Sequence, residues 1–214
     1  QGVFWYQAGQ PLGVIYGTKW VHTFAQLLDN PANAGAQASD YVVNPLGYLV
    51  LASQRGTANE VPIPYVDKTG ANKFIIGNVN PNLNYGFQND VRWGQFAIHA
   101  NFDGQMGGDI YNFSKQWMTQ DLRNPGMDMV GKAQDQKVAE NFFTLGIYNG
   151  LDPNQYFVES GAYLKLRELS VGYDVSPRLL PKIGLGQASG LRISFLARNL
   201  ITWTKYSGLD PDVV

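Results

Sequence analysis

Apolar and polar residues alternate with a period of two along five stretches of this chain, which predicts β-strands with two chemically different faces. In the last stretch, for example, Ile193 and Phe195 alternate with Arg192 and Ser194. The five stretches are residues 12–24, 83–93, 95–104, 162–175 and 190–204. The pattern therefore indicates an all-β protein.

Two local features refine the strand prediction. The second and third stretches are separated only by Trp93-Gly94, which predicts a tight β-hairpin. In the fourth stretch the alternation changes phase between Leu166 and Leu169. A β-bulge near Arg167 would let both halves of this strand keep one apolar face, because a bulge inserts one unpaired residue.

The connections between these stretches alternate between short and long. Short links lie at residues 93–94 and 176–189, and long links at about 25–82 and 105–161. Outer-membrane β-barrels have this asymmetry, with short periplasmic turns and long extracellular loops. The stretches also have ten or more residues, whereas a tilted strand needs ~9–11 residues to cross a membrane and soluble strands average ~5–6. A soluble β-sandwich remains the alternative.

Composition narrows the class of protein. The chain is 44% hydrophobic and 13% aromatic but only 15% charged, against ~25% charged residues in typical domains. A net charge of -1 and the lack of a basic stripe exclude a nucleic-acid partner. The chain has no cysteine, so it has no disulfide or thiolate zinc site. Its longest apolar run, residues 46–52, is too short for a membrane-spanning helix.

Aromatic residues near the ends of the predicted strands are candidates for the aromatic girdles that border the two membrane interfaces. Each of them also fits a packed core. These candidates are Trp20, Tyr85, Trp93, Tyr163, Tyr173 and Trp203.

No group of residues predicts catalysis, a cofactor or a metal site, so we do not expect an enzyme. Asp103 and Asp109 flank a glycine-rich turn, where they would act as paired carboxylates or calcium ligands, or simply solvate the end of a strand. His22 and His99 lie on different predicted strands without a neighbour at metal-ligand spacing.

Substrate-binding residues stay unassigned. Aromatic residues in the predicted loops, which are Tyr41, Tyr65, Trp117 and Tyr156, would suit stacking on sugar rings, but single exposed aromatics are also ordinary.

Five segments have distinctive sequences. The most specific is residues 163–173 (YLKLRELSVGY), and the others are residues 10–17 (QPLGVIYG), 77–90 (GNVNPNLNYGFQND), 102–112 (FDGQMGGDIYN) and 197–212 (ARNLITWTKYSGLDPD). Together these segments resemble the SusC/RagA-type TonB-dependent outer-membrane transporters of Bacteroidota, and residues 163–173 are similar to a strand of that family.

The resemblance implies a fold and a function. The family folds as a 22-stranded barrel that is blocked by an N-terminal plug. Residues 1–214 would then be a fragment from the C-terminal part of the β-barrel domain, without the plug domain and the final strand. The implied activity is TonB-dependent import of a bulky nutrient, an oligosaccharide or a peptide, across the outer membrane of a Gram-negative bacterium. The implied partners are a SusD-like substrate-binding lipoprotein, the TonB complex and the lipid bilayer.

Polar residues on the second face of the predicted strands would line the lumen of such a barrel and hydrogen-bond its plug, because buried charges need partners. These candidates are Lys19, Gln88, Asp90, Arg92, Gln95, Asn101, Glu168, Arg192 and Arg198. Two other functions remain open. One is a passive structural or adhesive barrel, and the other is a soluble β-rich carbohydrate-binding domain or enzyme.

Overall fold

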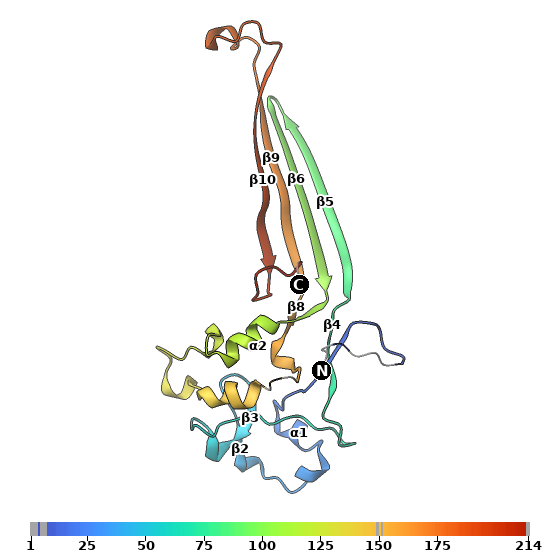
Figure 1. Ribbon diagram of the computed structural model, residues 1–214, viewed down its shortest axis with the longest axis vertical. Helices are drawn as coiled ribbons and strands as arrows, with labels where there is room; N and C mark the ends of the chain where they lie inside the picture. Colours follow the sequence, from blue (N-terminus) through green and yellow to red (C-terminus); the bar gives the residue numbers. More distant parts are fainter. Residues whose placement is uncertain (1–3, 5–7, 149, 151, 213–214) are drawn as a thin grey trace.

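The protein consists of a long antiparallel sheet that rises from a folded body (Figure 1). This computed structural model describes residues 4, 8–148, 150 and 152–212. The long sheet has four strands in the order β5-β6-β9-β10, so within this sheet each strand pairs with the one that follows it along the chain, although β7 and β8 lie between β6 and β9 in sequence. The strands are β5 (Pro81–Trp93), β6 (Phe96–Gly107), β9 (Tyr163–Val175) and β10 (Leu191–Thr204). Four of the five predicted strands are therefore confirmed.

The predicted hairpin connects β5 and β6. Trp93 pairs with Phe96, which leaves a two-residue turn of Gly94 and Gln95. Gly94 has a φ of 58°, a left-handed conformation that costs glycine little because it has no Cβ. The hairpin turn and the connection between β9 and β10 lie at the same end of the sheet, opposite the body (Figure 1).

The predicted bulge in β9 is also confirmed. Glu168 pairs with Asn101 of β6 and Leu166 pairs with Phe102, so Arg167 has no partner residue on β6. The ladder between β9 and β10 is irregular at the same height. The bulge thus restores the phase of the alternation, and both halves of β9 keep their leucines on one face.

The first predicted strand is wrong for most of its length. Only β1 (Val14–Gly17) is a strand, and it pairs with β4 (Phe74–Asn78) in the body. Ile15 and Val21 alternate in phase with Lys19, the residue predicted to lie on the polar side of this strand, yet both are buried. A side chain on Gly17 would have its Cβ 2.3 Å from a backbone oxygen. This segment is packed on both sides, which a two-faced membrane strand is not.

The two long connections fold together with β1 into the body and do not form open loops. The body contains two further antiparallel strand pairs, β2 (Tyr41–Val43) with β3 (Leu49–Leu51) and β7 (Asp109–Tyr111) with β8 (Val158–Ser160). Its α-helices are α1 (Phe24–Leu27) and α2 (Phe113–Gln120). Short 3-10 turns lie at Pro31–Asn33, Ala38–Asp40, Ala52–Gln54, Pro125–Met127, Gln134–Gln136 and Gln155–Phe157, and a π-helix at Phe142–Ile147. The all-β prediction therefore holds for the sheet but not for the body.

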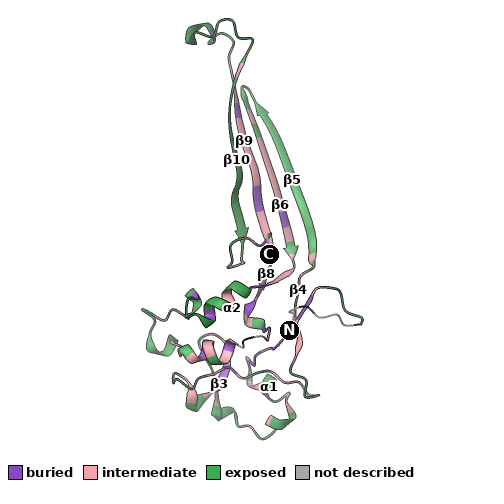
Figure 2. Cartoon of the chain, viewed as in Figure 1, coloured by how far each residue is buried: buried purple, intermediate pink, exposed green. Residues whose placement is uncertain are grey.

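The hydrophobic core lies in the body, as the distribution of buried residues shows (Figure 2). Fully or almost fully buried side chains form its main cluster: Ile15, Trp20, Val50, Tyr111, Val138, Phe142, Phe143, Ile147 and Phe157. Burial of such side chains from water is worth about 1.5–3 kcal/mol each, so the body has its own source of stability. None of the described helices and strands forms a second layer against the long sheet (Figure 1).

The long sheet is open, since β5 and β10 form its edges and neither pairs with another of the described strands. A closed barrel is not contained in these residues, although the sheet has the strand order of an up-and-down barrel wall. Every helix in the described part of the chain is too short or too polar to cross a membrane.

Candidate functional site: the two faces of the sheet and its junction with the body

One face of the long sheet is apolar. Residues directly opposite each other on paired strands project to the same face. Val91, Ile98, Val171 and Phe195 form one such row across the four strands. Phe195 is 65% exposed although it is a large hydrophobic residue. An exposed apolar face of this extent indicates contact with an apolar partner or a membrane.

Four of the six predicted interface aromatics lie near the ends of this face. Trp93 is 77% exposed at the hairpin end, where Tyr173 contacts Phe96 with 5.0 Å between ring centroids. Tyr85 and Trp203 belong to one cross-strand row near the other end.

The other two aromatic candidates lie elsewhere. Trp20 is 5% exposed and packs in the core of the body, because the strand predicted to carry it ends at Gly17. Tyr163 lies on the opposite, polar face of the sheet, where its hydroxyl donates to Asp212 over 3.0 Å. The bulge in β9 explains the second case, since it reverses the phase of the residues before Arg167.

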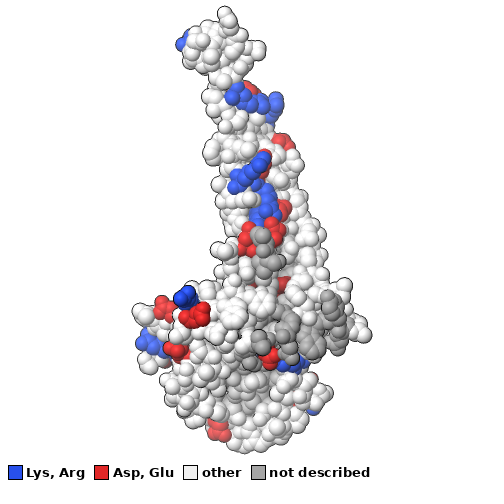
Figure 3. Space-filling model, in the orientation of Figure 1, with Lys and Arg blue, Asp and Glu red and all other residues white. Residues whose placement is uncertain are grey.

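The second face of the sheet is polar, and charged side chains follow the length of the strands (Figure 3). Charged and polar side chains of neighbouring strands pair on it. The guanidinium of Arg192 binds the Asp174 carboxylate through two contacts of 2.6 Å, Arg198 binds Glu168 at 3.2 Å, and His99 contacts Asp90 at 2.8 Å. Seven predicted lumen residues share this face: Gln88, Asp90, Arg92, Asn101, Glu168, Arg192 and Arg198.

Two predicted lumen residues are not on this face. Lys19 follows β1 into the body, where its Nζ lies 5.6 Å from the ring centroid of Phe74. Gln95 lies in the hairpin turn, and its Oε1 accepts from the Tyr173 hydroxyl at 2.6 Å. Lys19 is misplaced because the strand ends before it, and Gln95 because the turn begins at Gly94.

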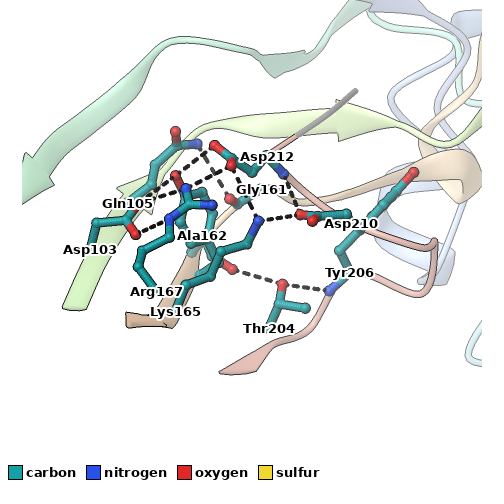
Figure 4. A network of polar contacts seen from close by, with 11 residues as sticks. Asp103, Gln105, Gly161, Ala162, Lys165, Arg167, Thr204, Tyr206, Asp210 and Asp212 are labelled. Carbon is teal, nitrogen blue, oxygen red and sulfur yellow. Dashed lines mark hydrogen bonds and ion pairs between the residues drawn. The ribbon is translucent and has the colours of Figure 1, made fainter. Parts of the chain in front are cut away.

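An ionic network ties the segment after β10 to the polar face where the sheet meets the body (Figure 4). Lys165, whose side chain is 3% exposed, donates to Asp210 at 2.5 Å and to Asp212 at 3.2 Å. Arg167 binds Asp212 at 2.7 Å and also holds Asp103. The hydrogen bond from Arg167 lowers the pKa of Asp212 to about 2, and the one from Lys165 lowers the pKa of Asp210.

Sequence reasoning did not find this network. The signal was present as two cations two residues apart, Lys165 and Arg167, and two carboxylates two residues apart, Asp210 and Asp212. Lys165 and Arg167 are two residues apart, so they share one face of the strand, and the bulge puts both on the polar face instead of the face of Leu169. Without the pairing of β9 with β10, the sequence does not place the two pairs together.

A second polar cluster lies where the body meets the same segment. The carboxylate of Glu159 accepts from the backbone nitrogen of Ser207 at 2.8 Å, from the Ser207 hydroxyl at 2.8 Å and from Lys115 at 2.8 Å. Asn112, which caps α2, donates to the same carboxylate at 3.4 Å. Burial opposes ionisation of Glu159, but these hydrogen bonds outweigh it and lower its pKa.

The remaining candidates for chemistry have separate contacts. Asp103 binds Arg167, whereas Asp109 accepts from the backbone nitrogen of Asn78 at 2.9 Å, so the two carboxylates do not act as a pair. His22 contacts the carbonyl oxygen of Gly47 at 2.7 Å. Among the described residues, no three His, Cys, Asp or Glu side chains are grouped so as to hold a metal ion.

Three of the four aromatic residues predicted to lie in loops pack against other aromatic rings in the body. Tyr41 packs on Phe24, Tyr65 on Phe74 and Tyr156 on Phe157, with ring centroids 5.1–5.8 Å apart. Trp117 of α2 is exposed.

Sequence comparison connects the chain to TonB-dependent receptors. The chain is 30% identical over 142 residues to TonB-dependent receptor P3 of Formosa agariphila and 23% identical over 146 residues to TonB-dependent receptor P26 of the same organism. The matches cover 66% and 64% of the chain and 14% of each receptor, so the chain spans a small part of these relatives. No protein-family model matches it.

Structural comparison gives the same picture for the fold. The chain is similar to the RagAB peptide importer in its closed-closed state, with a TM-score of 0.56 and 18% identity over 99% of the chain and 22% of the importer chain. The open-open state gives a TM-score of 0.54. These findings confirm the predicted resemblance to TonB-dependent transporters. The matched proteins are receptors and an importer, which also confirms that the chain is not an enzyme.

Proposed function

Starting from this likeness to TonB-dependent receptors, we propose that residues 1–214 are a wall segment of a SusC/RagA-type transporter in the outer membrane of a Gram-negative bacterium. The complete transporter imports a bulky nutrient, an oligosaccharide or a peptide. The likeness to a peptide importer favours the peptide. The plug domain and the final strand of the barrel belong to other parts of the polypeptide.

The observation that carries this proposal is the long sheet with one exposed apolar face and one polar face. Strand β9 has 13 residues. At ~3.3 Å per residue and a tilt of ~45°, such a strand spans ~30 Å, which is the thickness of the hydrocarbon core of a bilayer. The apolar face then contacts lipid, and Tyr85, Trp93, Tyr173 and Trp203 lie near the two interfaces.

The polar face then faces the lumen. Arg192, Arg198 and His99 already have partners on neighbouring strands. Gln88, Arg92 and Asn101 are the members of this face that we assign to contacts with the plug, because a plugged lumen offers polar groups in place of water.

The body lies at the end of the sheet opposite the hairpin turn (Figure 1), which makes it the extracellular part of the segment. Its exposed surface is then the side on which a SusD-like lipoprotein would deliver substrate, whereas the TonB complex would act from the periplasm on the plug. The two edge strands, β5 and β10, pair with further strands of the same barrel, because unpaired backbone groups in lipid cost several kcal/mol each.

The intact mass of the native polypeptide tests the proposal first. An antibody against residues 162–204 would recover it from separated soluble and outer-membrane fractions. We expect a protein several times larger than 23.7 kDa in the outer membrane. A soluble species near 23.7 kDa would refute the proposal and favour a self-contained β-domain.

Uptake of labelled peptides and oligosaccharides by cells with and without a functional TonB complex tests the activity. Uptake that needs both the transporter and TonB supports active import. A barrel whose deletion changes no uptake would be a passive or adhesive protein.

A further inference from the structure

Residues 205–212, which we call the strap, turn back onto the sheet after β10 ends at Thr204. Figure 4 shows Asp210 and Asp212 of the strap lying over the cations of β9. The strap contains no helix or strand in its described residues, and it contacts both the sheet and the body. Two separate groups of polar contacts hold it, one toward each end.

The sheet anchor of the strap is formed by Asp210 and Asp212. Their carboxylates accept from Lys165 at 2.5 and 3.2 Å, and Asp212 also accepts from Arg167 at 2.7 Å. The Tyr163 hydroxyl adds a contact of 3.0 Å to Asp212. All three donors come from β9, so this anchor attaches the strap to the polar face of the sheet.

The body anchor of the strap is formed by Ser207. Its backbone nitrogen and its hydroxyl each lie 2.8 Å from the carboxylate of Glu159 in β8. Asn112 donates to the Ser207 hydroxyl at 3.1 Å. This anchor depends on one partly buried carboxylate, which Lys115 also binds.

Between the anchors the strap is open to solvent. The side chain of Leu209 is fully exposed. A hollow of about 710 Å³ separates the middle of the strap from Ser114 and Met118 of α2. The strap is therefore held at its ends, by ion pairs and hydrogen bonds and by the buried Pro211, and it borders a hollow in its middle.

The two cations at the sheet anchor have most of their carboxylate partners only while the strap is in place. Lys165 and Arg167 face three carboxylates, those of Asp103, Asp210 and Asp212. If the strap leaves, the two cations keep only Asp103. Two cations that lose two of their three carboxylate partners favour another anion, because charge-assisted hydrogen bonds to a carboxylate are strong.

We propose that the strap is an autoinhibitory closure that opens as one unit and then presents Lys165 and Arg167 to a carboxylate group of an entering ligand. The inference rests on the proposed function, because opening matters only if this end of the sheet is the mouth of a transport pathway. In the closed state the strap's own carboxylates occupy the place of the ligand.

Hydrogen exchange at single amides, measured in the complete receptor reconstituted in lipid, tests whether the strap moves as a unit. Each anchor is weakened in turn, and the exchange rate is measured at the other anchor. Asp210→Asn with Asp212→Asn weakens the sheet anchor, and the amide of Ser207 reports on the body anchor. Glu159→Gln weakens the body anchor, and the amide of Asp212, which donates to Asp210 at 3.0 Å, reports on the sheet anchor. We expect each change to accelerate exchange at the distant anchor roughly tenfold or more.

Asp174→Asn is the matched control, because it breaks an ion pair of the same sheet that does not touch the strap. Exchange that accelerates only at the altered anchor, or equally in the control, would overturn the proposal. Lys165→Met provides a second route to the same readout at Ser207, in case the double variant does not fold.

Succinate tests the ligand class, since its two carboxylates resemble those of the strap. Succinate should accelerate Ser207 exchange more than sodium chloride at the same ionic strength, and this difference should vanish in Lys165→Met. Equal effects of both salts would overturn anion binding at this site. None of these readouts depends on transport, so their failure is distinct from failure of the proposed function.

Discussion

Replacement of Leu169 by arginine tests which face of the sheet contacts lipid. Leu169 lies six residues from each end of β9 (Tyr163–Val175), and its neighbours in register are Ala100 and Ala197. At ~3.3 Å per residue and ~45° of tilt, six residues rise ~14 Å, which places Leu169 near the bilayer midplane. Arginine on the lipid face at this depth costs ~2–4 kcal/mol. The ratio of folded to unfolded protein should thus fall by roughly 30-fold to 1000-fold.

The matched control is Ser170→Arg, one residue further along β9 on the polar face, opposite His99. We expect a loss below ~1 kcal/mol there, because surface and lumen positions tolerate charge. Leu164→Arg, in the row of Tyr85 at the end of the apolar face, should cost only ~0–1 kcal/mol. Urea titration of the complete receptor in lipid vesicles measures all three. If Ser170→Arg costs as much as Leu169→Arg, the assignment of the faces is wrong.

Three further outcomes follow from the contacts at the junction and in the body. Lys165→Met should lower the free energy of unfolding of the receptor by about 1–3 kcal/mol in urea titration. This loss is smaller than for a fully buried ion pair, because the carboxylate partners of Lys165 are about one-third exposed. An unchanged free energy of unfolding would show that the network adds no stability. Gly17→Ala should lower the melting temperature of the receptor, since its Cβ would lie 2.3 Å from a backbone oxygen, whereas Gly35→Ala, with open space around it, should not. Acid should release the strap. The pKa of Asp212 is lowered from 3.8 to about 2, and the pKa of Glu159 is also lowered. The ionised carboxylates therefore stabilise the strap fully above about pH 5, and this stabilisation is lost as the pH falls toward 2. Exchange of the Ser207 amide measured from pH 5 to 2, after correction for the intrinsic rate, should accelerate, and a rate independent of pH would contradict the ionic anchors.

The alternation of apolar and polar residues predicted the sheet well because each of its strands has one apolar face and one polar face. In β10, for instance, Ile193 and Phe195 lie on one face and Arg192 and Ser194 on the other, as the pattern requires. The bulge at Arg167 was also predictable, since only an inserted residue reconciles the two phases of β9.

The same reasoning failed where tertiary contacts override the pattern. Residues 12–24 alternate, but Ile15 and Val21 make both sides apolar, and the segment is buried in the body. The long connections carried no periodic signal, because short turns and strand pairs such as β2 with β3 are stabilised by distant packing partners.

The candidate site was predictable only in part. Residues on regular strands, such as Arg198 and Glu168, could be assigned to the polar face from the alternation of side chains along the strand alone. The strap could not be found in this way, because Asp210 and Lys165 are 45 residues apart and meet only after the chain turns back at the end of β10.

Lipid quenching along β10 tests the central claim most directly. A fluorescent label at single cysteines in positions 193–197 reports on each face in turn. The 214 residues contain no cysteine, and any cysteine elsewhere in the reconstituted receptor is first replaced by serine. Nitroxide-labelled lipids should quench the label strongly at Ile193, Phe195 and Ala197 and weakly at Ser194 and Leu196, with a period of two. Quenching that is uniform, absent or strongest at Ser194 would contradict a barrel wall with an apolar face toward lipid.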